Sequence, residues 1–287
     1  MNLALLLLPV LGIATATAEL IELSYTYNVD APTSATLSPF VHKQIKKGFN
    51  ELGIWVELND FCSSEHSGTH VDAPVHFAEH GWSLDAIPTR RLWRVPAVVI
   101  DVSKHIKVNQ PNYEVKIKDF EDWENTYGTI PDGSLVLIRT GWGAKVREIR
   151  QYLGMDANNN QNYPGIGKGA AEWLTRHGKR HGYSMGVIGV GIDTASVDVG
   201  KSVRYPSHVA LYKENIYGIE NMANLDKLPA KGAFVTVLPM RIGKGSGGPA
   251  RVIAEVGEAS GAPGIFPSTL MLVVMVAVAL IKGIVVI

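Results

Sequence analysis

The segment His66-Ser-Gly-Thr-His70-Val-Asp72-Ala-Pro-Val-His76 carries three histidines and one aspartate within eleven residues. All four stand at even-numbered positions, and residues two apart share one face of an extended strand. A helix would align only the first two histidines, and its interior would be interrupted by the proline. We therefore expect an extended segment with one chemically active face, formed by His66, His70, Asp72 and His76.

This residue set predicts a metal centre. Two imidazoles and a carboxylate are typical of a catalytic metal ion, because they leave coordination positions open for water and substrate. A metal ion held there would lower the pKa of its bound water and polarise a carbonyl group. Gly68 would leave room beside the metal or the substrate. His80 has the same parity, but Gly81 follows it, and we expect His80 at the surface.

The rest of the chain alternates between apolar β-branched runs and helical patterns, which favours a mixed α/β domain. Two helices are expected, at 119–127 and 167–180, and a surface loop at 156–162, where four Asn and one Gln occur. The runs expected to be buried strands are 97–101, 134–138, 186–192 and 233–238.

Composition excludes some classes of partner. Hydrophobic residues make up 46% of the 287 residues and the formal net charge is zero. No run of Lys or Arg offers the concentrated positive charge that nucleic-acid binding requires. The chain is therefore not expected to bind nucleic acid, and its composition gives no hint of an acidic or basic substrate.

Both ends differ from the middle. An apolar run at 3–13 and small residues up to Ala18 predict a signal peptide over 1–18. Residues 257–287 read as a linker and an apolar tail, either a GPI-attachment signal or a transmembrane anchor, with Lys282 awkward for both. Between them, 19–256 reads as a single domain. We expect the protein in the secretory pathway, extracellular and anchored at the cell surface.

Cys62 is the single cysteine, so no disulfide within the chain is possible. It lies four residues before His66, where a thiolate could bind metal. A small apolar packing residue is the favoured interpretation.

The motif resembles the signature His-x-Gly-Thr-His-x-Asp-x-Pro-x-His of the cyclase family, which includes bacterial-type kynurenine formamidases and isatin hydrolases. The resemblance covers most of 20–256. Later blocks that resemble the family, in the same order, are Leu137-Ile-Arg-Thr-Gly-Trp142, Gly191-Ile-Asp-Thr-Ala-Ser-Val-Asp198, His208 with Glu220, and Gly247-Gly-Pro-Ala-Arg251.

The resemblance implies a swivelling β/β/α domain with a mixed sheet and flanking helices, one or two divalent metal ions, and homo-oligomeric assembly. It implies that zinc is the metal, with manganese as the alternative. By the same resemblance, Asp72 would bridge to a second ion, and His76 would donate and accept the proton during catalysis. The implied metal ligands are His66, His70, Asp72, His208 and Glu220.

One departure concerns the substrate. Formamidases of this family carry a Trp-Pro-Gly segment near the N-terminus, whereas this chain reads Ala31-Pro-Thr-Ser-Ala-Thr-Leu-Ser-Pro39. The residues that bind substrate are therefore left open. Trp55 or Phe61 could supply an aromatic wall, but both are expected in the core.

The resemblance also implies a small-molecule amide or lactam substrate, and the predicted function is hydrolysis of an amide bond, as in an arylformamidase that converts N-formylkynurenine to kynurenine and formate in tryptophan catabolism. An isatin hydrolase-like lactam hydrolase is the alternative. A non-catalytic, surface-anchored binding protein on the same fold is the alternative of another class, but the intact residue set favours an enzyme.

Overall fold

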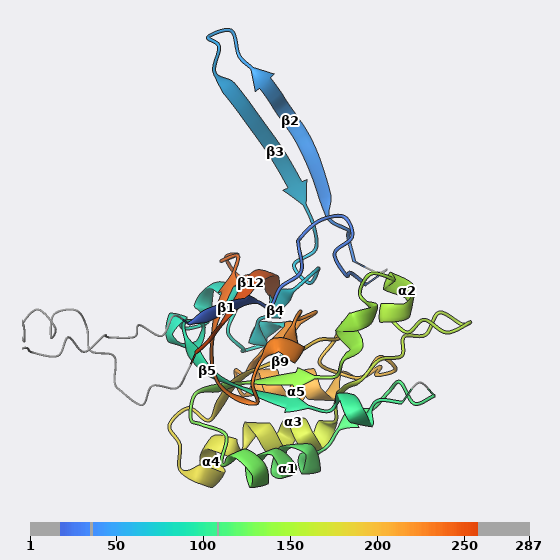
Figure 1. Ribbon diagram of the computed structural model, residues 1–287, viewed down its shortest axis with the longest axis vertical. Coiled ribbons are helices and arrows are strands. Elements are labelled where there is room, and N and C mark those ends of the chain that lie inside the picture. The colour runs from blue at the N-terminus through green and yellow to red at the C-terminus, as the bar shows by residue number, and fades with distance from the viewer. Residues whose placement is uncertain (1–17, 35–36, 108, 258–287) are drawn as a thin grey trace, which may run out of the picture. The chain divides into compact units, whose positions relative to one another are not determined.

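The structure is a computed structural model that describes residues 18–34, 37–107 and 109–257 (Figure 1). The signal peptide and the C-terminal tail expected from the sequence lie outside these residues, apart from Ala18 and Gly257. Among the described residues, no helix has the length and apolar character needed to cross a membrane.

The regular elements of the described residues are strands, α-helices and 3-10 helices. The strands are β1 (Glu19–Glu22), β2 (Val41–Phe49), β3 (Trp55–Cys62), β4 (His70–Asp72), β5 (Val95–Asp101), β6 (Glu114–Val115), β7 (Ser134–Arg139), β8 (Gly165–Ile166), β9 (Val187–Ile192), β10 (Tyr217–Glu220), β11 (Lys231–Pro239) and β12 (Gly247–Val256). The α-helices are α1 (Ile117–Tyr127), α2 (Ile149–Tyr152), α3 (Lys168–Thr175), α4 (His177–His181) and α5 (Pro206–Lys213). The 3-10 helices are η1 (Pro74–His76), η2 (Leu84–Ala86), η3 (Thr89–Arg91), η4 (Ser103–His105), η5 (Trp142–Lys145) and η6 (Leu225–Lys227).

One mixed sheet organises the domain, in the strand order β1-β12-β11-β5-β7-β9-β10-β4. Strands β5, β7, β9 and β10 are parallel to one another, and the remaining pairings are antiparallel. The short strand β4 pairs with β10 on one side and with β12 on the other, so it closes the sheet on itself. His70 of β4 thereby stands opposite Glu220 of β10.

Two apolar cores lie on the two faces of the parallel strands. Because successive side chains of a strand point to opposite faces, Val99 of β5 enters one core while Val98 and Ile100 enter the other. The first core packs against the antiparallel strands, and the second packs against α1, α3 and α5. In Figure 1, α1, α3 and α4 lie together on that side of the sheet. The expected β/β/α arrangement is confirmed.

The local predictions agree with these elements. The four predicted strands correspond to β5, β7, β9 and β11, and the helix expected at 119–127 is α1. The helix expected at 167–180 is instead two, α3 and α4, interrupted at Arg176. The second of these ends at Gly182, which adopts a left-handed φ of 67°. His80 is exposed, as expected.

The interpretation of Trp55, Phe61 and Cys62 as packing residues is wrong. Strands β2 and β3 form a separate two-stranded sheet, which extends away from the rest of the domain in Figure 1. Because this hairpin pairs only with itself, no layer covers it, and Trp55 and Phe61 are 52% and 54% exposed. Cys62 is also exposed and belongs to no group of metal-ligating side chains found among the described residues.

Candidate metal centre

The motif residues do not share one strand face, as the alternation predicted. Only His70–Asp72 forms a strand, His66 lies in a turn before it, and His76 ends η1. The chain bends at Gly68, where φ is +63°, and again where Pro74 begins η1. The side chains nevertheless converge, because turn, strand and 3-10 helix fold round one point. Donor atoms of His66, Asp72 and His76 lie within 4.8 Å of one another.

Gly68 has a different role from the one expected. A Cβ at this position would lie 2.7 Å from the Tyr27 ring, and the left-handed φ itself favours glycine. The Gly68 carbonyl accepts hydrogen bonds from His70 Nδ1 at 2.9 Å and from Asn221 Nδ2 at 2.8 Å. Glycine therefore shapes the turn that orients His70, and it does not make room for a ligand.

Asp72 occupies the middle of the centre. Its Oδ1 lies 2.7 Å from His66 Nδ1 and 3.1 Å from His70 Nε2. Its Oδ2 lies 3.2 Å from His208 Nε2 and accepts a 2.7 Å hydrogen bond from the Tyr212 hydroxyl. One carboxylate thus faces two sets of histidines, which is the geometry that a bridging ligand requires.

His70 provides the test of whether a metal ion fits. Its Nδ1 is occupied by the Gly68 carbonyl, which directs Nε2 into the centre. Nε2 is buried and makes no well-aligned hydrogen bond, although it lies 3.1 Å from Asp72 Oδ1 and 3.5 Å from Glu220 Oε2. A buried nitrogen lone pair without a partner is unfavourable, and two carboxylates beside it would compensate a cation. The residues present therefore fit a divalent ion.

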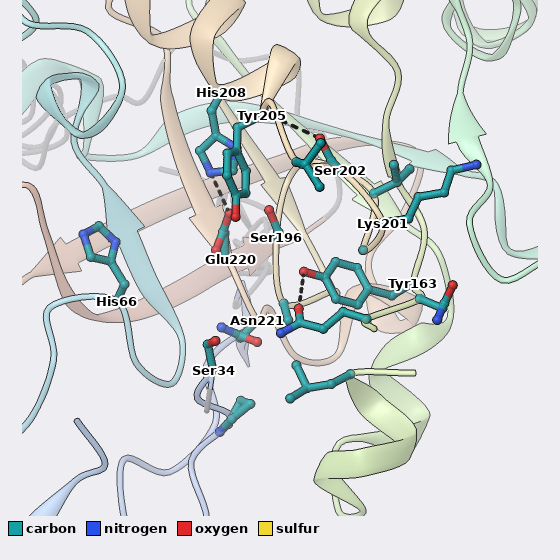
Figure 2. Close-up of a pocket in the computed structure, with 18 of the residues that line it drawn as sticks. Ser34, His66, Tyr163, Ser196, Lys201, Ser202, Tyr205, His208, Glu220 and Asn221 are labelled. Atoms are coloured by element: carbon teal, nitrogen blue, oxygen red, sulfur yellow. Dashed lines mark hydrogen bonds and ion pairs between the residues drawn. The ribbon is translucent and has the colours of Figure 1, made fainter. Parts of the chain in front are cut away.

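His208 and Glu220 complete the centre from more distant parts of the chain. Figure 2 shows the two side chains pointing toward one another, with His66 to their left. His208 Nε2 lies 3.2 Å from Glu220 Oε1, which also accepts the Val197 backbone N–H at 2.9 Å. All five predicted metal ligands and the predicted catalytic His76 therefore meet in one place.

The carboxylates of the centre favour positive charge on the neighbouring histidines. Burial by itself would lower the pKa of His70, but Asp72 and Glu220 outweigh it and raise the pKa to about 9. Burial would likewise lower the pKa of His208, yet Asp198, Asp72 and Glu220 raise it well above its usual value. Burial would raise the pKa of Asp72, but the three neighbouring imidazoles hold it well below its usual range. A divalent cation would take the place of protons on these imidazoles.

His76 differs from the other histidines. Its ring stacks on His66, with centroids 3.9 Å apart, and contacts Phe77 at 4.5 Å. Burial lowers the pKa of His76 to about 4, against the opposing charge of Asp72. The imidazole is therefore neutral near pH 7, and a neutral imidazole can accept a proton.

Asp198 contacts His208, a role that the sequence did not indicate, although Asp198 closes the block at 191–198. Its Oδ2 accepts a 2.6 Å hydrogen bond from His208 Nδ1, and its carboxylate also accepts the backbone N–H groups of Ser207 and His208. It thus holds the start of α5 and directs His208 Nε2 toward Asp72. Spacing alone could not reveal this role, because only the fold places Asp198 against α5.

Replacing Asp198 by Asn should weaken metal binding 10- to 100-fold, since carboxylates that orient a ligating histidine contribute about that much. Competition with a coloured chelator measures the affinity. Asp132→Asn is the matched control, because Asp132 also accepts several backbone N–H groups but lies away from the centre. Equal loss in both variants would assign Asp198 a structural role only.

A cavity of about 640 Å³ opens above the centre and is lined by His66, His76, His208 and Glu220 (Figure 2). Its volume suits a small organic molecule. The predicted surface loop at 156–162 is confirmed as a loop and also forms one wall of this cavity. The segment in which the chain departs from the formamidases forms part of another wall, through Pro32, Thr33, Ser34 and Leu37.

The aromatic wall comes from residues that the sequence did not indicate. Phe77, Tyr163 and Tyr205 line the cavity, whereas Trp55 and Phe61 do not. Lys201 brings a cationic side chain to the same cavity. These residues are candidates for substrate contact.

Comparisons with known proteins show which family the chain resembles. The family model described as "Putative cyclase" matches residues 21–199. The isatin hydrolase of Roseibium aggregatum is 31% identical over 79% of this chain and 86% of its own. A kynurenine formamidase of Bacillus cereus is 25% identical over 83% of this chain and 97% of its own. Isatin hydrolase A from Ralstonia solanacearum superposes with a TM-score of 0.73 at 31% identity, covering 83% of this chain and 92% of that one.

Fold, side-chain set and relatives together define a metal-dependent hydrolase. The chain belongs to the cyclase family, whose model matches more than half of its length. The relatives named here are hydrolases of amide bonds, and none of these comparisons supports the alternative of a non-catalytic binding protein.

Proposed function

We propose that this protein hydrolyses the amide bond of a small aryl substrate, with a lactam of the isatin type as the first candidate. The observation that carries the proposal is the buried, unpartnered Nε2 of His70 between two carboxylates, beside a cavity of about 640 Å³. The lactam is placed first because of the 31% identity to an isatin hydrolase.

N-Formylkynurenine is the second candidate. The kynurenine formamidases support it, and so does Lys201, which could pair with a substrate carboxylate at the cavity. Isatin carries no carboxylate before its ring opens. The two substrates therefore differ in whether a carboxylate is present to pair with Lys201 in the cavity.

The metal would be zinc, with manganese as the alternative, held by His66, His70, Asp72, His208 and Glu220. When bound, such an ion polarises a carbonyl group and lowers the pKa of water. Asp72 faces histidines with both of its oxygens, which favours two ions over one.

The remaining steps belong to the chain itself. Neutral His76 would take a proton from the attacking water and deliver it to the departing nitrogen as the C–N bond breaks. Phe77 and Tyr205, whose rings lie 5.1 Å apart, would hold the aryl group. Water then supplies both the hydroxyl group that the carbonyl carbon gains and the proton that the nitrogen gains, so the reaction needs no other reactant.

The test is a direct assay of residues 19–256, stripped of metal and reloaded with zinc or manganese, against isatin and N-formylkynurenine. Metal-dependent ring opening of isatin is the expected result. Preferential cleavage of N-formylkynurenine would transfer the assignment to the second candidate. Failure to cleave either, with metal bound, would overturn the proposal for both.

We also propose that two copies of the chain associate through the β2–β3 arm. The arm exposes eight large apolar side chains, which are Val41, Ile45, Phe49, Leu52, Ile54, Trp55, Leu58 and Phe61. Each is 50–82% exposed, and at roughly 100 Å² per side chain the two faces of the hairpin together offer about the ~800 Å² per partner of a standard interface. An isologous dimer would cover both arms at once.

A Phe49→Glu/Trp55→Glu variant should be monomeric, because these rings contact each other at 5.3 Å on the exposed arm and charge cannot be buried there. Sedimentation at micromolar concentration measures the mass, with a dimer expected for the natural sequence. Lys47→Gln is the control, since it changes an exposed polar side chain of the same arm. A monomeric natural chain would contradict the proposal.

The sequence further supports secretion by residues 1–18 and anchoring by residues 257–287. We favour a GPI anchor over a transmembrane span. A phospholipase C specific for phosphatidylinositol should release the protein from intact cells. Retention on the membrane after that treatment would identify a transmembrane anchor.

A further inference from the structure

A second group of metal-ligating side chains lies away from the cavity, on the helices that cover the parallel strands. It consists of Glu124 on α1 with His177 and His181 on α4, and donor atoms of the three lie within 4.8 Å of one another. None of the three lines the cavity above the metal centre. In Figure 1, α4 lies beside α1.

His177 is the unusual member of this group. Its side chain is completely buried, yet neither ring nitrogen makes a hydrogen bond. Buried polar atoms in folded proteins nearly always have a partner, so this ring calls for an explanation. Nε2 lies 3.5 Å from Glu124 Oε1, which is longer than a good hydrogen bond.

That separation suits two ligands of one ion. Nitrogen and oxygen donors at 2.0–2.1 Å from a tetrahedral zinc ion lie about 3.3 Å from each other. His181 follows His177 by one helical turn, and residues four apart on a helix face the same side. The two rings are 4.6 Å apart between centroids, and His181 is exposed.

The surrounding charges permit a cation here. Glu124 supplies the negative charge, and its Oε1 also accepts the Ile130 backbone N–H at 3.0 Å, which holds the carboxylate in place. Arg180, next to His181, is held against Trp173: its guanidinium lies 3.8 Å from the ring centroid and donates to the Trp173 carbonyl. Its charge acts on both His177 and Glu124, so the Glu124 carboxylate would offset this neighbouring cation as well as the ion.

We propose that Glu124, His177 and His181 form a peripheral site for one divalent transition-metal ion of the zinc class, which ties α4 to α1. Three protein donors would leave one position for water. The ion would give the buried His177 ring a partner and would stabilise the helical layer, without contact with substrate.

The test is a count of bound zinc in the full chain. After removal of metal, reloading with zinc and desalting, elemental analysis should give one zinc fewer per chain in His181→Ala and in Glu124→Gln than in the natural sequence. Glu124→Gln keeps an oxygen for Ile130. His80→Ala, which removes another exposed histidine, is the control and should keep the full count.

Thermal melting gives a second readout. Zinc at about 100 times its dissociation constant should raise the melting temperature of the natural chain several degrees more than that of His181→Ala. Equal zinc counts and equal shifts in all variants would overturn the site. Because neither readout uses turnover, a protein that cleaves no amide but loses one zinc on His181→Ala would support this site while refuting the proposed function.

Discussion

Asp72→Asn should abolish metal binding and hydrolysis together. The Asp72 carboxylate contacts His66, His70 and His208, so its negative charge is next to all three imidazoles. Asparagine keeps the shape but loses the charge, and its amide would direct N–H groups at nitrogens that must bind the ion. We expect a loss well beyond the 10- to 100-fold that residues outside the ligand set contribute. Elemental analysis and kcat/KM on the same sample measure both effects.

The control for this variant is Asp226→Asn, which removes an exposed carboxylate elsewhere. It should bind metal and turn over substrate as the natural chain does. Circular dichroism must show Asp72→Asn folded, since the carboxylate also accepts the Tyr212 hydroxyl. A folded Asp72→Asn protein that retains its metal would contradict the assignment of Asp72 as the central ligand.

His76→Ala should lower kcat by about 10²- to 10⁴-fold, the usual contribution of a general acid–base side chain. Metal content should stay unchanged, because the other histidines and both carboxylates remain. KM should change little, since the aryl group is proposed to rest on Phe77 and Tyr205. Steady-state kinetics beside elemental analysis separate these quantities.

Loss of metal in His76→Ala would assign His76 to the ligand set, which its approach to His66 and Asp72 makes geometrically possible. Unchanged turnover with full metal content would remove it from proton transfer. His80→Ala is the matched control, because it removes an exposed histidine four residues further along the same segment.

Much of the fold could be predicted from local patterns. The runs at 97–101 and 134–138 are buried strands because apolar residues fill both faces of a covered parallel sheet. The helical period at 167–180 was also correct, except that it could not reveal the interruption at Arg176. Alternation failed for His66 and His76, since the bends at Gly68 and Pro74 break the strand on either side of β4.

The hairpin shows a second limit of local patterns. Trp55 and Phe61 have the composition of core residues, and apolar side chains predict burial only where another layer is present. Strands β2 and β3 pair with each other alone, so the same side chains are exposed. The spacing of apolar residues is the same in a strand that another layer covers and in one that stays uncovered, so it cannot tell them apart.

The sequence by itself determined which side chains could carry metal chemistry, because imidazole and carboxylate at His66, His70, Asp72 and His76 are chemical identities that no fold alters. Only the tertiary structure decided how they meet. The pairing of β4 with both β10 and β12 sets His70 opposite Glu220, and α5 brings His208 to the far side of Asp72. Contacts between residues so distant along the chain depend on strand register and packing, which local sequence does not encode.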